Sequence, residues 1–154
     1  MIRVTVWNEF QHERTQEKVK EIYPDGIHTC IAKFLRQEEE LSVRTAVFDE
    51  KEHGLTEEVL ANTDVLVFWN HMLQEEFSDD VAERVRRHVL AGMGLVVLHS
   101  GHYSKIMRKL LGTSMTLRWR HGDRERLFCT CPSDRAGNSG MGGYSGGRDV
   151  WGVF

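Results

Sequence analysis

The segment GLVVLHSGHYSK, residues 94–105, joins a short apolar run to a polar turn. A continuous run of about four to eight apolar residues, such as GLVVLH here, is typical of a strand buried on both faces of a sheet. A helix is predicted directly after the turn, at 103–111, because glycine at residue 112 is a common C-terminal stop. The segment therefore predicts a strand, a turn and a helix in succession, with His99 and His102 in the turn.

Upstream of this segment lie a second apolar strand and the clearest helix of the chain. DVLVFW at 64–69 is continuously apolar and is predicted as a strand. Ser78 is a favourable N-cap residue, valines recur at every fourth position through 81–89, and Gly92 supplies a C-terminal stop. These signals predict an amphipathic helix between Ser78 and Gly92.

The N-terminal half continues the same alternation. IRVTVW at 2–7 and SVRTAVF at 42–48 are rich in β-branched residues and are predicted as strands. Apolar residues at helical spacing predict a helix at 27–35, and a shorter helix is expected at 56–61. The polar stretch NEFQHERTQE, residues 8–17, is expected to cross the surface as a loop. Strands that alternate with helices indicate right-handed crossovers and an α/β fold with a parallel sheet.

Composition predicts a single cored domain in the cytoplasm. The 154 residues are 40% hydrophobic and 28% charged, which suits one domain with its own core. The net charge of −3, with both signs intermixed, lacks the basic field of a nucleic-acid-binding protein, so we expect no nucleic-acid partner. No apolar run reaches the roughly 18 to 20 residues that span a membrane, and we expect no membrane partner. Three cysteines suit a reducing compartment and are given no chemistry.

Polar residues follow three of the predicted strands at the point where each strand ends. Ligands of parallel α/β sheets bind beyond these carboxyl ends, near the position where the strand order reverses. We therefore expect the three groups to converge on one crevice and to form the functional site. The groups are Asn8, Glu9 and His12; Asn70 and His71; and His99, Ser100 and His102.

Histidines at such a turn have two chemical uses. Neutral imidazole can transfer protons near pH 7, or it can bind a divalent metal such as zinc, and Glu9 or His12 could supply a further base or ligand. The pair His99 and His102 alone is a weak zinc motif, because a zinc site needs three or four converging ligands. Both uses stay open at this point. Three other histidines are interpreted as structural, namely His28, His53 and His88.

Four motifs give the chain a resemblance to a known family. RVTVWNEF, LVFWNH, GLVVLHSGHYSK and TLRWRHGDRERL, in this order between residue 2 and about residue 130, resemble the trehalose utilisation protein (ThuA-like) family. The resemblance implies the class I glutamine amidotransferase-like fold, a flavodoxin-like three-layer α/β sandwich with the first strand inside a parallel sheet. Amidotransferases carry a nucleophilic cysteine in the turn motif GxCxGHQ. Alignment of Gly101 and His102 with its GH places His99 at the cysteine, so glutaminase chemistry is not expected.

The resemblance implies a function in disaccharide metabolism. We expect proton transfer or metal-assisted chemistry beside the carbonyl of a sugar or keto-sugar, as in an isomerase, a lyase or a hydrolase. In this interpretation His99 or Glu9 takes the proton alpha to the carbonyl, while His102, or a metal bound by His99 and His102, polarises the oxygen. The alternative is a non-catalytic sugar-binding or regulatory subunit that keeps the fold and has lost the chemistry.

A small-molecule sugar is thus the expected partner, and association of the chain with copies of itself in a homo-oligomer stays open. Trp7 and Trp69 stand at strand ends, where tryptophan can stack on a sugar face, although core packing is its more common role. The polar stretch RWRHGDRERL at 118–127 adds one further histidine. The residues expected to bind substrate are Asn8, His12, Trp69, His71, Ser100 and His121.

The final segment, residues 131–154, does not follow the family pattern. Seven of its 24 residues are glycine, and its apolar residues have neither helical nor strand spacing. Such a segment buries too little surface to offset the entropy of ordering, so we expect it to be irregular. A reading-frame shift after about residue 130 is one explanation, because one shifted frame allows family-like sequence at 131–135 and at 146–153. The expected organisation is an incomplete family domain at 1–130 and a glycine-rich tail.

Overall fold

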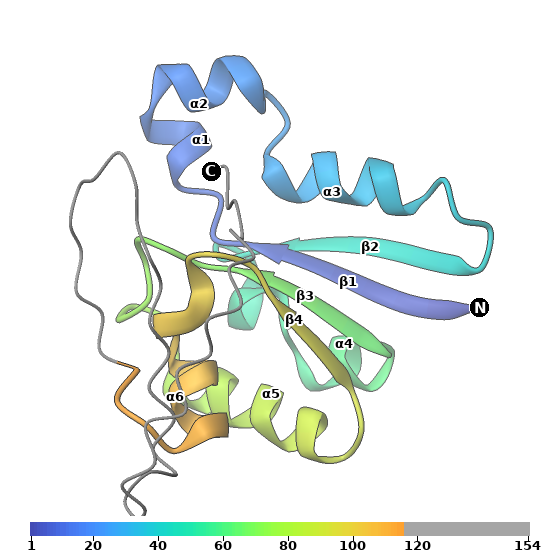
Figure 1. The fold of residues 1–154 in the computed structure, drawn as a ribbon, viewed down its shortest axis with the longest axis vertical. Coiled ribbons are helices and arrows are strands. Elements are labelled where there is room, and N and C mark those ends of the chain that lie inside the picture. Colours follow the sequence, from blue (N-terminus) through green and yellow to red (C-terminus); the bar gives the residue numbers. More distant parts are fainter. Residues whose placement is uncertain (116–154) are drawn as a thin grey trace, which may run out of the picture. The chain divides into compact units, whose positions relative to one another are not determined.

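The structure is a computed structural model that describes residues 1–115. These residues form a sheet with helices on both of its faces (Figure 1). Predictions for the segment 118–127, for His121 and for the tail at 131–154 lie outside the described residues. Within residues 1–115, every helix is too short or too polar to span a lipid bilayer.

The sheet of the described residues consists of β1 (Ile2–Asn8), β2 (Leu41–Val47), β3 (Val65–Trp69) and β4 (Gly94–Val97). The strands are all parallel and follow the order β2-β1-β3-β4 (Figure 1). This confirms the predicted flavodoxin-like α/β sheet with the first strand in an interior position. The register pairs Asn8 of β1 with Trp69 of β3, so the polar segments that follow these two strands begin side by side.

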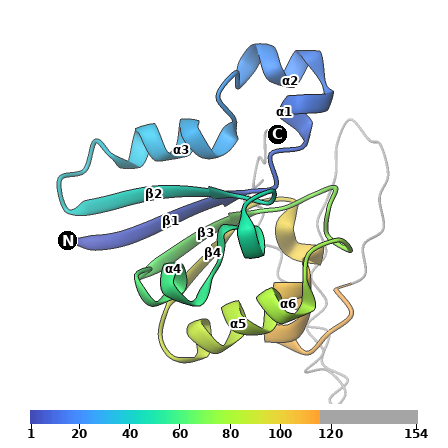
Figure 2. The same ribbon diagram turned by 180° about the vertical axis from the view of Figure 1, so that it is seen from behind.

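One face of the sheet is covered by α3 (Ile27–Leu35), which follows the short helices α1 (His12–Thr15) and α2 (Glu17–Ile22) (Figure 2). Ala32 of α3 is buried against Val6 of β1 in the smaller of two apolar clusters. The position of α3 confirms the helix predicted at 27–35. Both figures show α1 and α2 beyond the carboxyl end of β1, near the edge where the polar residues were expected.

The opposite face is covered by α5 (Asp79–Leu90) and α6 (Lys105–Leu111), with the shorter η1 (Lys51–Gly54) and α4 (Glu57–Ala61) on the same side (Figures 1 and 2). The larger apolar cluster lies between this face and its helices. Complete burial of one large apolar side chain there stabilises the fold by about 1.5–3 kcal/mol. Members of this cluster include Trp7, Leu66, Phe68, Phe77, Val85 and Ile106.

Serine caps set where the two longest helices of this face begin. Ser78 Oγ accepts a hydrogen bond from the amide of Val81 at 3.5 Å, which confirms its predicted N-cap role for α5. Ser104 caps α6 in the same way. Helix α6 therefore begins at Lys105 rather than at residue 103, and the residues before its cap form the 3₁₀ turn η2 (Gly101–Tyr103).

The prediction that residues 8–17 cross the surface as a polar loop is wrong. The segment contains α1, and the side chains of Asn8, Glu9 and Glu13 are buried. Glu13 Oε1 accepts hydrogen bonds from Asn8 Nδ2 at 2.7 Å and from the amide of Ile27 at 2.9 Å, whereas Oε2 of the same carboxylate has no hydrogen-bond partner among residues 1–115. The contact with Ile27 joins the start of α3 to the end of β1, and local sequence patterns do not reveal such a pairing.

Trp7 belongs to the core and not to the carboxyl edge of the sheet. It is 1% exposed, and its ring stacks on Phe68 with centroids 4.5 Å apart. Its Nε1 donates to the carbonyl of His53 at 2.7 Å, which satisfies the polar atom of the buried indole. Trp7 is therefore not accessible for stacking on a sugar.

Candidate functional site

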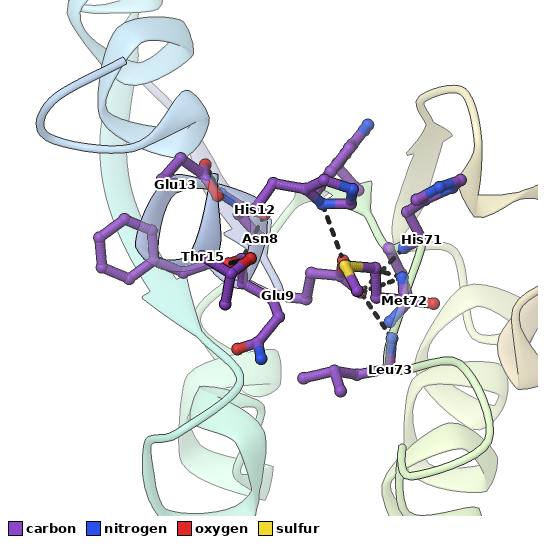
Figure 3. Close-up of polar contacts among 12 residues, drawn as sticks. Asn8, Glu9, His12, Glu13, Thr15, His71, Met72 and Leu73 are labelled. Atoms are coloured by element: carbon purple, nitrogen blue, oxygen red, sulfur yellow. Dashed lines mark hydrogen bonds and ion pairs between the residues drawn. The ribbon is translucent and has the colours of Figure 1, made fainter. Parts of the chain in front are cut away.

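The polar groups predicted at the strand ends meet at the carboxyl edge of the sheet. Figure 3 shows the side chain of Glu9, which follows β1, reaching across to the backbone that follows β3. His71, in that second segment, contacts Ser100 in the turn after β4. We name this group the strand-end cluster and define it as Glu9, His12, Trp69, His71, His99, Ser100 and His102.

Glu9 links the end of β1 to the loop after β3. Its side chain has no exposed surface, and its carboxylate accepts hydrogen bonds from the backbone amides of His71, Met72 and Leu73 at 2.9 to 3.0 Å (Figure 3). Amide donors meet the charge of a carboxylate that would otherwise be costly to bury. Both carboxylate oxygens are engaged, so the geometry favours a positioning role for Glu9 over the predicted role of a base.

His12 lies between Glu9 and His71. Its Nδ1 is 3.5 Å from Glu9 Oε1, and its ring centroid is 5.0 Å from that of His71. Trp69 stands edge-on to His12, with centroids 5.5 Å apart, and is stacked with His71 at 6.3 Å. The structure thus brings three of the predicted substrate-binding residues into one aromatic group, and Trp69, unlike Trp7, is only partly buried.

His71 and Ser100 connect the loops after β3 and β4. The Nδ1 atom of His71 and the Oγ atom of Ser100 form a hydrogen bond. Partial removal from water lowers the pKa of His71 below its ordinary value of 6.5, and the charges of His12 and His99 lower it further, while Glu9 opposes them. The imidazole is therefore predominantly neutral at pH 7 and able to accept a proton.

His99 and His102 form a stacked pair in the turn after β4. Their ring centroids are 5.5 Å apart and the ring planes are inclined by 28°. Burial lowers the pKa of His102, and the charges of His99 and His71 add to this effect. The backbone carbonyl of His99 accepts a hydrogen bond from Trp69 Nε1 at 2.5 Å, which ties the turn to the end of β3. Both predicted histidines therefore belong to the cluster.

The described histidines do not complete a zinc site. Zinc in proteins takes three or four protein ligands in a tetrahedral arrangement. Within the part of the chain that the structure describes, no group of three or more histidine, cysteine, aspartate or glutamate side chains has an arrangement that could hold a metal ion. His99 and His102 alone would supply only two imidazoles, so a metal-binding role for them stays a prediction.

Asn8 belongs to a separate hydrogen-bond network with Glu13 and His28. Its Nδ2 contacts Glu13 Oε1 at 2.7 Å and His28 Nδ1 at 3.2 Å, and its Oδ1 accepts a hydrogen bond from the amide of Phe10 at 3.0 Å. The side-chain amide is thus engaged at both ends and is fully buried. This geometry favours a structural role for Asn8 over the predicted contact with substrate.

The histidines interpreted as structural have contacts of that kind. His28 is buried in the Asn8 network. His53 binds the backbone on both sides of its ring, through Nδ1 to a carbonyl at 2.9 Å and through Nε2 to the amide of Ser78 at 3.1 Å. His88 Nε2 lies 2.8 Å from Glu57 Oε1 and connects α5 to α4. None of these contacts involves the strand-end cluster.

Two further residues lie beside the cluster: Gln74, which the sequence analysis did not predict, and Asn70, which it placed in the expected crevice without an individual role. Gln74 Nε2 donates to the backbone carbonyls of Ser100 at 3.1 Å and of Asn70 at 3.4 Å, and so bridges the segments after β3 and β4. Asn70 is buried, and within residues 1–115 neither polar atom of its side chain has a hydrogen-bond partner. Its place at a strand end is a sequence signal for Asn70, whereas nothing in the sequence distinguishes Gln74.

The chain is an α/β protein with a parallel flavodoxin-like sheet, and polar side chains gather at the carboxyl ends of its strands, where α/β proteins commonly bind ligands. The family model for trehalose utilisation (ThuA) matches residues 3–135, and the chain belongs to this family. The match confirms the resemblance carried by the four motifs and supports a role in trehalose utilisation. No curated protein matches the chain.

Proposed function

We propose that the protein acts on a sugar or keto-sugar in trehalose utilisation by transferring protons beside a carbonyl group. The observation that carries this proposal is the convergence of four imidazoles, those of His12, His71, His99 and His102, from the ends of three parallel strands. His71 and His99 are exposed to solvent, so a substrate can reach them. Lowered pKa values keep His71 and His102 predominantly neutral near pH 7.

His99 and His102 carry the reaction in this proposal. His99 takes the proton from the carbon alpha to the carbonyl, and His102 donates a hydrogen bond to the carbonyl oxygen, which stabilises the enolate charge as it forms. Glu9 acts at a distance, because it holds the loop that carries His71. The sugar is bound by the remaining side chains of the cluster, with a ring face against Trp69 and hydroxyl groups bonded to His12, His71 and Ser100.

Exchange of hydrogen with solvent tests the proposal. A keto-disaccharide incubated with the protein in deuterated buffer should lose the NMR signal of the proton alpha to its carbonyl. His99→Ala should slow this exchange by about 100-fold or more, since a general base contributes at least that factor. His88→Ala is the matched control, because His88 pairs with Glu57 on α4, and it should leave the exchange rate unchanged.

The outcomes separate the two functions that the family suggests. Exchange that depends on His99 supports an enzyme. Binding of the keto-disaccharide without exchange would identify a sugar-binding or regulatory subunit instead. If the protein neither binds the keto-disaccharide nor catalyses exchange, both functions are contradicted. Loss of exchange on treatment with a chelator, restored by zinc, would support the metal-assisted form of the reaction.

A further inference from the structure

We propose that Ser100 and His71 form a nucleophile and a base that transfer the acyl group of a carboxylic ester to water, with an O-acylated sugar as the class of substrate. This activity goes beyond proton transfer on a keto-sugar, and only the sugar part of its substrate rests on the proposed function. It rests on the contact between two side chains that the fold brings together from the ends of β3 and β4.

The contact itself is the first argument. Serine is a weak nucleophile unless a neighbouring base takes its proton, and the structural signature of an activated serine is an imidazole nitrogen within hydrogen-bond distance of its Oγ. Ser100 Oγ and His71 Nδ1 form this hydrogen bond although 29 residues separate them. Ser100 itself is 7% exposed, while His71 faces solvent, so the pair lies at the boundary between the fold and an incoming ligand.

The second argument is that other residues hold both partners in place. The backbone of His71 is bound by the buried carboxylate of Glu9, and the carbonyl of Ser100 is bound by Gln74. Gly101 allows the turn to approach β4 closely, because a Cβ at this position would lie 2.9 Å from Val97 Cγ1. The hydroxyl and the imidazole are thus presented from two fixed backbones, and fixed geometry of this kind is what nucleophilic catalysis requires.

The third argument is the side chain of Asn70. It is buried, and among residues 1–115 its Oδ1 and Nδ2 have no hydrogen-bond partner, which is costly unless a ligand supplies one. Asn70 directly precedes His71, and its backbone nitrogen lies 3.6 Å from the position that a Cβ on Gly101 would take. We assign Asn70 Nδ2 to the oxyanion of the tetrahedral intermediate, because a buried amide N–H is an effective donor to that charge.

The chemistry balances with water as the co-reactant. Ser100 Oγ attacks the carbonyl carbon of the ester while its proton passes to His71 Nδ1, and a tetrahedral oxyanion forms. The bond from carbon to the alcohol oxygen then breaks, and the alcohol leaves with the proton from His71. Water attacks the acyl-serine ester, gives one proton to His71 and leaves its hydroxyl on the acyl carbon. Ser100 Oγ departs and recovers the proton from His71.

General serine probes test the proposal on the full chain. A fluorophosphonate should add one phosphonyl group to Ser100, as located by peptide mass spectrometry, and p-nitrophenyl acetate should release nitrophenol. Ser100→Ala should abolish both, and His71→Asn should slow both by about 100-fold or more. Asn70→Ala should slow nitrophenol release by about 100-fold. Ser42→Ala removes an exposed serine at the amino end of β2 and should change neither.

Labelling of a different serine, or equal labelling in the His71→Asn variant, would overturn the proposal. Ser100→Cys provides a second measurement that does not require the hydroxyl. A thiol beside a neutral imidazole ionises readily, so at pH 7 the introduced thiol should react with iodoacetamide at least about tenfold faster than the exposed Cys30. In a double variant that combines Ser100→Cys with His71→Asn, this difference in reaction rate should disappear. Equal rates at the two sulfur atoms would also overturn the proposal.

The two proposals fail separately. The serine probes contain no keto-sugar, so their failure leaves the result of the hydrogen-exchange experiment unchanged. Loss of hydrogen exchange in His99→Ala, conversely, says nothing about acylation of Ser100. Hydrogen exchange without reaction of the serine probes would therefore contradict the ester proposal alone, and reaction of the probes without hydrogen exchange would contradict the proton-transfer proposal alone.

Discussion

Glu9 is a charge without exposed surface, and such a charge is tolerated only where donors surround it. Here the donors are three successive backbone amides, from His71 to Leu73. The carboxylate therefore fixes a stretch of backbone in one conformation, and the side chain of His71 takes its position from that stretch. Every chemical role assigned to His71 depends on this contact.

Glu9→Gln keeps the shape of the side chain and removes its charge. The variant loses an acceptor and places an NH₂ group against backbone donors, so we expect the free energy of unfolding to fall by about 2–3 kcal/mol. Urea unfolding followed by circular dichroism measures this change. Glu76→Gln, at an exposed position in the segment between β3 and α5, is the control and should cost less than about 0.5 kcal/mol. Equal costs for the two variants would contradict the positioning role.

His28 determines part of the dependence of stability on pH. Burial lowers the pKa of its ring below the ordinary value of 6.5, although Glu13 opposes the effect. The unfolded chain therefore binds a proton more readily than the folded chain, and stability falls as the pH drops from about 6.5. Urea unfolding at pH 7, 6 and 5 should show this loss. His28→Asn should show a smaller loss over the same range, and an identical slope in both proteins would count against the assignment.

At the level of single residues, the sequence could locate the site better than it could assign roles. Residue type and position at a strand end are visible in the sequence. These two features correctly predicted that five residues lie close together, namely Glu9, His12, His71, His99 and Ser100. Hydrogen-bond partners are not visible in the sequence, because they come from distant segments. For this reason Asn8 and Glu9, whose buried side chains are engaged in hydrogen bonds within the fold, were assigned to substrate and to proton transfer.

The turn between β4 and α6 approaches β4 closely at Gly101. Gly101→Ala would place a Cβ 2.9 Å from Val97 Cγ1, so we expect the free energy of unfolding to fall by about 1–3 kcal/mol. Val97→Ala removes the atom in conflict. In a double-mutant cycle measured by urea unfolding, the two changes together should cost less than the sum of the single changes. Additive costs would show that the Cβ introduced at residue 101 does not conflict with the side chain of Val97.

Elements with a strong local pattern were predicted well, and so was the short helix α4, whereas the short helices α1 and α2 were not. The strands and the helices α3 and α5 have continuous or periodic apolar residues, and their positions agree with the sequence analysis. The helices α1 and α2 lack such a pattern, and α1 is joined to the fold by a contact from a distant segment, the hydrogen bond from the amide of Ile27 to Glu13. The start of α6 was placed too early, since the cap is Ser104 and the preceding turn is 3₁₀.

At the scale of the whole chain, parallel pairing follows from helices that separate successive strands, which is why the sheet could be predicted. The limits of the folded domain are a separate prediction. The family match ends at residue 135, and the residues after it are rich in glycine. Deletion of residues 136–154 should change the free energy of unfolding by less than about 1 kcal/mol, as measured by urea unfolding. A larger loss would show that these residues contribute to the domain.

The placement of Trp69 gives the strand-end cluster an optical signal of its own. Indole emission is quenched by a protonated imidazole nearby, and the ring of Trp69 lies 5.5 Å from that of His12 and 6.3 Å from that of His71. The indole of Trp7, in contrast, is enclosed by the apolar core. Proton uptake by His71, or the arrival of a ligand beside Trp69, therefore changes the contribution of Trp69 to the intrinsic fluorescence, and titrations of this site need no added dye.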